Sequence, residues 1–125
     1  MPDIRIQPLA AHHLGAAADL LTQLNPETPA AVIAERLQTL LADHSNYLLV
    51  GAFSQEKLVG LAGAWIATKI WCGRYLEIDN LVVDPTLRSA GLGSALMRWL
   101  EDLARAEDCE IAVLDSYTSN HASHR

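Results

Sequence analysis

The sequence LVVDPTLRSAGLGSALMRWLEDLARA, residues 81–106, decides the fold class of this chain. It begins with an apolar strand over residues 81–83 and ends in an amphipathic helix predicted over residues 92–106. Two glycines, Gly91 and Gly93, stand where this helix begins. The first amides of a helix have no internal partner, and the helix dipole favours negative charge there. The junction between strand and helix therefore predicts a site for a phosphate or a pyrophosphate.

Three phosphate-binding motifs can be distinguished at this junction. A Walker loop ends in Gly-Lys-Ser/Thr, but no lysine follows Gly93. A dinucleotide-binding fingerprint has a third glycine at the position where this chain has Leu96. The pattern Arg/Gln-x-x-Gly-x-Gly/Ala matches Arg88, Gly91 and Gly93 at every fixed position. The third pattern is therefore the one that the sequence supports.

That pattern is the acyl-CoA pyrophosphate loop of the GNAT family of N-acetyltransferases, which this chain resembles. Residues 75–85 look like the family's fourth strand, and residues 119–122 resemble the start of its last helix. The resemblance covers most of the chain and is strongest over residues 75–125. It implies that the chain uses acetyl-CoA to acetylate a primary amine, expected to belong to a small molecule, by direct attack in a ternary complex. A non-catalytic acyl-CoA-binding or dimerisation module is the alternative.

The hydrophobic periodicity predicts the element order β-α-α-β-β-β-α-β-α. Strands are expected over residues 4–7, 47–53, 58–66, 75–83 and 110–115, and helices over residues 9–24, after Thr28 as N-cap, over residues 92–106 and from about residue 119. The crossover between residues 76 and 114 should be parallel, which makes this an α/β chain with a mixed sheet. The resemblance adds that the sheet is centrally splayed and flanked by helices.

The family pattern continues past the last residue of this sequence with a Phe-Tyr pair and two more strands. We therefore expect residues 1–125 to form a single N-acetyltransferase domain without those C-terminal strands. A strand near residue 114 would then lie at an open sheet edge, which is a template for pairing with another chain. This favours a homodimer.

Charge, hydrophobicity and cysteine content limit the classes of partner and the cellular compartment that we expect. The chain has 15 acidic and 9 basic residues and a net charge of −6, which argues against a nucleic-acid partner and is compatible with a cationic amine. No apolar run approaches the roughly 20 residues that span a membrane. Cys72 and Cys109 form no CxxC pair, and two thiols in a reducing cytoplasm are the simplest interpretation. His121 and His124 are three residues apart with no evident third ligand, so no metal site is expected.

The resemblance places cofactor binding on the strand end, the loop and the last helix. Backbone amides of the loop are expected to hold the pyrophosphate, and Arg88 adds charge or orients the loop. The backbone of residues 81–83 is expected to bind pantetheine while their side chains pack in the core, and Asn120 either binds pantetheine or caps the last helix. The expected cofactor-binding residues are Leu81, Val82, Val83, Arg88, Ser89, Ala90, Gly91, Leu92, Gly93, Ser94 and Asn120.

Three residues are candidates for the chemistry of acetyl transfer. Glu77 aligns with a strand glutamate that is the base in some family members, and an amine with a pKa of about 10 must lose a proton before it attacks. Asp79 should face the same side of the strand as Glu77. There the two carboxylates would bind an ammonium, or the charge of one would raise the pKa of the other. Tyr117 is the candidate general acid. The alternative for both carboxylates is that they are solvated.

Overall fold

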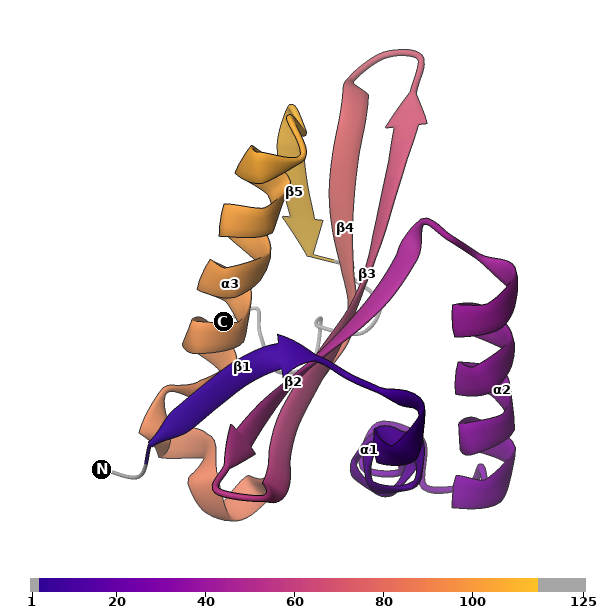
Figure 1. The fold of residues 1–125 in the computed structure, drawn as a ribbon, viewed down its shortest axis with the longest axis vertical. Coiled ribbons are helices and arrows are strands. Elements are labelled where there is room, and N and C mark those ends of the chain that lie inside the picture. The colour runs from indigo at the N-terminus through magenta and orange to yellow at the C-terminus, as the bar shows by residue number, and fades with distance from the viewer. Residues whose placement is uncertain (1–2, 115–125) are drawn as a thin grey trace.

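The computed structural model describes residues 3–114, and its centre is a mixed sheet (Figure 1). The strands, in their order across the sheet, are β1 (Ile4–Pro8), β2 (Tyr47–Ser54), β3 (Lys57–Lys69), β4 (Gly73–Val83) and β5 (Ile111–Leu114). The first four strands pair antiparallel, and β5 pairs parallel to β4. The mixed sheet and the parallel crossover that the sequence predicts are thus confirmed.

Helices cover both faces of this sheet (Figure 1). On one face lie α1 (Leu14–Leu21), which follows the short 3-10 turn η1 (Ala11–His13), and α2 (Ala30–Asp43). On the other face lies α3 (Leu92–Ala106), which the 3-10 segment η2 (Pro85–Ala90) joins to β4. The predicted order is confirmed as far as β5, and the expected last helix lies outside the described residues.

Each face of the sheet buries its own apolar cluster. The helix α3 places an apolar residue at every fourth position, which is one face of a helix, and all four are buried on the sheet: Leu92, Leu96, Leu100 and Ala104. Complete burial of one leucine contributes about 2 kcal/mol. The opposite cluster joins α1 and α2 to the sheet through Leu14, Ala17, Leu21 and Leu37. The two clusters fix both helix layers against β3 and β4.

The first two helices begin later than the sequence predicts. Leu9 extends the sheet, because its amide donates to the Leu49 carbonyl oxygen at 2.9 Å, so α1 begins only at Leu14. Pro29, with φ −61° and ψ 147°, is the N-cap residue of α2 in place of Thr28. A proline has no amide to donate and its φ suits a helix entrance, so the helix starts without a side-chain cap.

A bulge interrupts the pairing of β4 with β3. Asp79 lies opposite Gly63 and Val82 opposite Leu61, so three steps along β4 match two steps along β3. Asn80, at the bulge, has a φ of 59°, a left-handed conformation that asparagine adopts more readily than most residues. The extra residue changes which side of the sheet each following side chain faces.

The bulge gives the two halves of β4 different buried faces. Before it, Leu76 and Ile78 are buried in the cluster beneath α3. After it, Val82 is buried in the cluster of α1 and α2 instead. Because side chains alternate along a strand, Glu77 and Asp79 face α1 and α2 as Val82 does. Glu77, Asp79 and Val82 therefore all lie on the side of the sheet that α1 and α2 cover.

Candidate active site

The loop between β4 and α3 is held by a turn at one end and by a glycine at the other. The Asp84 carboxylate accepts hydrogen bonds from the Thr86 amide at 2.9 Å and from its hydroxyl at 2.8 Å. These hydrogen bonds, and less strongly the charge of Lys57, lower the pKa of Asp84. Gly91 ends η2 and caps α3 with a φ of 80°, a conformation that glycine adopts without strain. The loop thus enters α3 through a sharp turn that needs a glycine.

The first turn of α3 presents amides without intrahelical acceptors. The first hydrogen bond of the helix joins the Ala95 amide to the Gly91 carbonyl oxygen at 3.0 Å, so the amides of residues 92–94 precede it. No acidic side chain lies in this turn. A Cβ atom on Gly93 would meet nothing nearer than Val83 Cγ2 at 4.0 Å, so the protein leaves this approach open. The turn can accept an anion such as a pyrophosphate.

The end of β4 next to this loop has an edge that a ligand can use. Residues 75–78 pair with β5, and β4 then continues to Val83 with no β5 partner among residues 3–114. The side chains of Leu81 and Val83 pack toward α3, and Val82 is buried on the other side. These side chains are core residues, as predicted. The binding of pantetheine by their backbone stays a prediction.

The two candidate carboxylates lie on the face covered by α1 and α2. Glu77 pairs directly with Trp65, and Asp79 pairs directly with Gly63. Both side chains are half-buried. The alternation expected from the sequence is therefore present up to the bulge, and the catalytic roles of Glu77 and Asp79 stay predictions.

Tyr47, a residue that the sequence did not single out, reaches this face from β2. Its side chain is buried, and its ring packs 4.7 Å from that of Trp65. A Cβ atom on Gly63 would collide with the Tyr47 hydroxyl, so this hydroxyl lies over the glycine opposite Asp79. Burial, and then the charge of Asp79, raise the pKa of Tyr47. The phenol is therefore protonated and can donate a hydrogen bond; a glycine inside a strand is the sequence signal for such a close approach.

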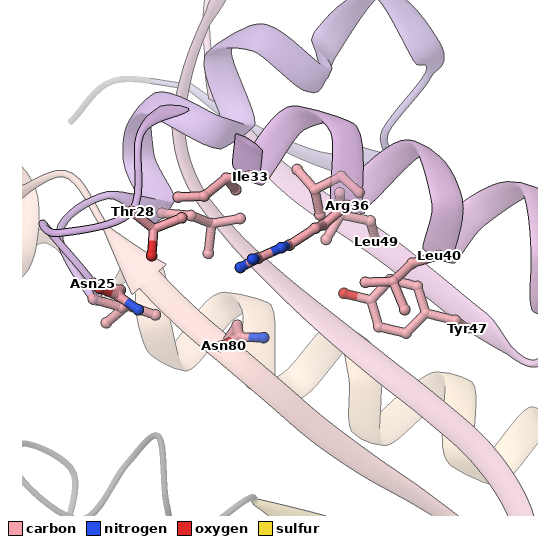
Figure 2. A pocket seen from close by; sticks show the side chains of 11 residues that line it. Asn25, Thr28, Ile33, Arg36, Leu40, Tyr47, Leu49 and Asn80 are labelled. Carbon is pink, nitrogen blue, oxygen red and sulfur yellow. The ribbon is translucent and has the colours of Figure 1, made fainter. Parts of the chain in front are cut away.

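A pocket of about 220 Å³ lies between α2 and the sheet, and we call it the α2 pocket (Figure 2). Its wall is mostly apolar: Leu21, Leu24, Ile33, Leu37, Leu40 and Leu49. Five polar residues complete the lining: Asn25, Thr28, Arg36, Tyr47 and Asn80. Asn80 is the bulge residue of β4, so the irregularity that redirects the strand also brings an amide side chain to the pocket.

The spacing of apolar residues in α2 is the sequence signal for Arg36, which no motif contains. Arg36 lies three residues after Ile33 and four before Leu40, both on the apolar face of α2. Residues at these spacings share one helix face, so a cation there points toward the core side of the helix. Figure 2 shows its guanidinium extending into the pocket.

Part of the predicted site lies outside the described residues. Tyr117 and Asn120 belong to this part, and the side chains of residues 88–90 are also not described. Within residues 3–114, no three His, Cys, Asp or Glu side chains come together as a metal site. None of the described helices combines the length and the apolar character that a membrane span requires.

Comparison with known proteins identifies the family. Residues 16–125 match the sequence model of the acetyltransferase (GNAT) family. This chain belongs to the GNAT family. It is an N-acetyltransferase, and acetyl-CoA is its cosubstrate. The binding of its anionic part by the first turn of α3 stays a prediction.

Two curated GNAT relatives act on small amines. Glucosamine 6-phosphate N-acetyltransferase 1 of Oryza sativa subsp. japonica is 31% identical over 120 residues, which cover 89% of this chain and 72% of that protein. Thialysine N-epsilon-acetyltransferase of Caenorhabditis elegans is 32% identical over 88 residues, which cover 66% of this chain and 55% of that protein. This chain thus spans most of the first relative and about half of the second.

Solved structures confirm the fold. A Trypanosoma brucei acetyltransferase superposes with a TM-score of 0.77 at 25% identity, over 96% of this chain and 92% of that chain. An aminoglycoside N-acetyltransferase in complex with CoA superposes with a TM-score of 0.84 at 18% identity, over 99% of this chain and 84% of that chain. The mixed sheet flanked by helices is the GNAT fold, as the sequence predicted.

Proposed function

We propose that this protein transfers the acetyl group of acetyl-CoA to the primary amine of a small molecule by direct attack in a ternary complex. The observation that carries this proposal is the position of β4. Its end leads into the anion-accepting turn of α3, and its bulge residue Asn80 lines the α2 pocket. One strand thus connects a place for the cosubstrate with a place for the acceptor, which is the positioning that a two-substrate reaction needs.

The cosubstrate would bind along the end of β4 and the loop. The amides of residues 92–94 hold the pyrophosphate, and the free edge of β4 after residue 78 holds the pantetheine by main-chain hydrogen bonds. The thioester then lies near the bulge, where donors stabilise the oxyanion that develops on its carbonyl. What supports this arrangement is the set of amides and the edge of β4 that has no β5 partner among residues 3–114.

The acceptor would reach the thioester from the side of α1 and α2. Its amine nitrogen forms a bond to the thioester carbonyl carbon, and the C–S bond breaks. A proton of the ammonium passes to Glu77 or Asp79, directly or through water, and the thiolate of CoA takes up a proton. Cys72 and Cys109 are free thiols that lie shortly before the starts of β4 and β5, whereas the loop to α3 follows the other end of β4. This position supports direct attack over a covalent relay.

The named relatives support a small acceptor. One of them acts on glucosamine 6-phosphate and the other on thialysine, and both compounds carry a primary amine. The α2 pocket, at about 220 Å³, has the size for part of such a molecule. We propose that this protein acetylates an amine of this kind.

Two further expectations belong to this proposal. In the described part of the sheet β5 is an edge strand, and an edge of this kind favours pairing with a second copy. The free thiols of Cys72 and Cys109 suit a reducing compartment such as the cytoplasm. Sedimentation of the purified protein tests the homodimer, and a monomer at high concentration would contradict it.

A thiol-release assay tests the reaction. Purified protein and acetyl-CoA are mixed with a panel of glucosamine 6-phosphate, thialysine, free amino sugars and polyamines. We expect release of CoA that depends on the amine, with one acetyl group added to the product by mass spectrometry. Calorimetry with CoA is the parallel measurement. CoA binding without turnover of any amine would overturn the proposal and favour a non-catalytic acyl-CoA-binding module.

A further inference from the structure

We infer that the α2 pocket binds an anionic group of the acceptor, a phosphate or a carboxylate, through Arg36. This inference rests on the proposed function and narrows the acceptor to a primary amine that also carries an anionic group. The amine would lie toward β4 and the anion toward α2. The inference concerns the pocket alone, so it can fail while the proposed acetyl transfer stands.

Arg36 is the cation of the pocket, and its charge is not compensated there. The ion pairs within residues 3–114 are Lys57–Asp84, Arg74–Glu107 and Arg105–Asp102, and none includes Arg36. Among the residues that the structure describes, no acidic residue lines the α2 pocket. Its guanidinium extends into the pocket (Figure 2), and the other polar residues of the lining carry only amide or hydroxyl groups. Because Arg36 is an exposed residue, its guanidinium is accessible to an anion that binds in this pocket.

The neighbouring polar groups suit an oxyanion. Asn25 and Asn80 each carry an amide that can donate, and Thr28 carries a hydroxyl. A guanidinium presents paired donors that match two oxygens of a phosphate or a carboxylate. The apolar remainder of the wall offers no polar group that competes with the guanidinium for such an anion. The lining therefore favours an anion and disfavours a second cation.

The opposite charge lies at the β4 side of the pocket. Asp79 precedes the pocket residue Asn80 in the strand, and its charge acts on the hydroxyl of Tyr47, which also lines the pocket. An ammonium is attracted toward this carboxylate, whereas a phosphate or a carboxylate is attracted toward Arg36. A molecule with both groups would be held in one orientation, with its amine at β4, where the thioester is expected.

Other cations near β4 are engaged elsewhere. Arg74 donates to the Glu107 carboxylate at 2.9 Å and to the Glu107 carbonyl oxygen at 2.8 Å. The Lys69 ammonium lies 4.9 Å from the centre of the Tyr75 ring. Both residues lie at the far end of the hairpin between β3 and β4. The net charge of −6 is compatible with a cationic amine, and the position of Arg36 leads us to infer an anionic group on the same acceptor.

Matched acceptor pairs test the subsite. The phosphate arm compares glucosamine 6-phosphate with glucosamine, and the carboxylate arm compares thialysine with its carboxamide. The enzyme variants are Arg36→Met, Arg36→Lys and, as control, Arg98→Met, because Arg98 is also exposed but lies on α3 at the other face of the sheet. Kinetics are measured for acceptor and acetyl-CoA separately, and acceptor binding is measured by calorimetry in the presence of CoA.

We expect the unmodified protein to prefer the anionic member of at least one pair, and the preferred arm identifies the anion. Arg36→Met should lower kcat/KM for that member about tenfold or more, because a charge-assisted hydrogen bond is lost. The neutral member and the KM for acetyl-CoA should change less than about twofold. Arg36→Lys should retain part of the preference, and Arg98→Met should behave as the unmodified protein.

Three results would overturn the inference. The first is no preference for the anionic member in either pair. The second is an equal loss for charged and neutral acceptors in Arg36→Met, which indicates a structural role. The third is a rise in the KM for acetyl-CoA alone, which would indicate that Arg36 binds the cosubstrate and not the acceptor. If no amine is acetylated, the proposed function fails, but weaker calorimetric binding of the anionic probes to Arg36→Met would still support the subsite.

Discussion

The phenol of Tyr47 stays protonated beside Asp79, because burial and then the charge of that carboxylate both raise its pKa. The two residues come from different strands, with β3 between them. They meet because Gly63 leaves room for the Tyr47 hydroxyl directly opposite Asp79. Tyr47 thus connects the α2 pocket with β4, the strand that carries both candidate bases.

Gly63→Ala should destabilise the protein by about 1–3 kcal/mol, because the new methyl group forces the buried Tyr47 ring to move. Gly15→Ala is the matched control. A Cβ atom on Gly15 meets nothing within 4 Å, and alanine at this exposed position should stabilise α1 by about 0.5 kcal/mol. Urea unfolding of the two variants measures both changes. Equal stability of Gly63→Ala and the unmodified protein would show that the position of the Tyr47 ring does not depend on this glycine.

Gly93→Glu should abolish CoA binding and leave the fold intact, because it puts bulk and negative charge at the open first turn of α3. Gly91 is the less suitable position, since its φ of 80° strains any other residue. Calorimetric titration with CoA measures the effect. Gly15→Glu adds the same side chain to the first turn of α1 and should leave CoA affinity unchanged. Normal CoA affinity in a folded Gly93→Glu variant would show that the pyrophosphate does not bind at this loop.

Glu77→Gln should slow acetyl transfer about 100-fold at neutral pH if this carboxylate is the general base. The loss should shrink at high pH, where the amine needs no base, and the KM for acetyl-CoA should change little. The measurement is a pH series of kcat/KM for a productive amine. Glu101→Gln, on the exposed side of α3, is the control. A loss that is the same at every pH would indicate an electrostatic or structural role for Glu77.

Asp84 should make the stability depend on pH in the acid range. Its hydrogen bonds from Thr86 lower its pKa below 3.8, so the folded state gains stability from the ionised carboxylate above that pH. This gain is lost as the pH falls through the lower, folded pKa. Asp84→Asn should therefore have a lower Tm than the unmodified protein at pH 7, and the difference should shrink toward about pH 2.

The control for this series is Asp102→Asn, which removes an exposed ion pair with Arg105 and should change the Tm little. The measurement is thermal unfolding of all three proteins from pH 2 to pH 7. A Tm difference for Asp84→Asn that is constant over this range would mean that the turn does not depend on the charge of Asp84.

The sequence by itself determined the features that depend on neighbouring residues. Apolar positions four residues apart predicted α3 with its bounds at Leu92 and Ala106, and the glycines before it marked its turn. The order of strands and helices followed from the same local periodicity, and the crossover to β5 had to be parallel. These predictions succeed because a helix face and a strand alternation are set by residues a few positions apart.

Only the tertiary structure decided which residues share the acceptor side. Arg36, Tyr47 and Asn80 belong to three different elements, α2, β2 and β4, and come together at one pocket through the packing of α2 on α1 and β2. The bulge at Asn80 then changes the face of every later residue in β4. A one-residue change of register moves each side chain to the opposite face of a sheet. The position of a charge in this pocket therefore depends on pairings between distant segments, which only the folded chain contains.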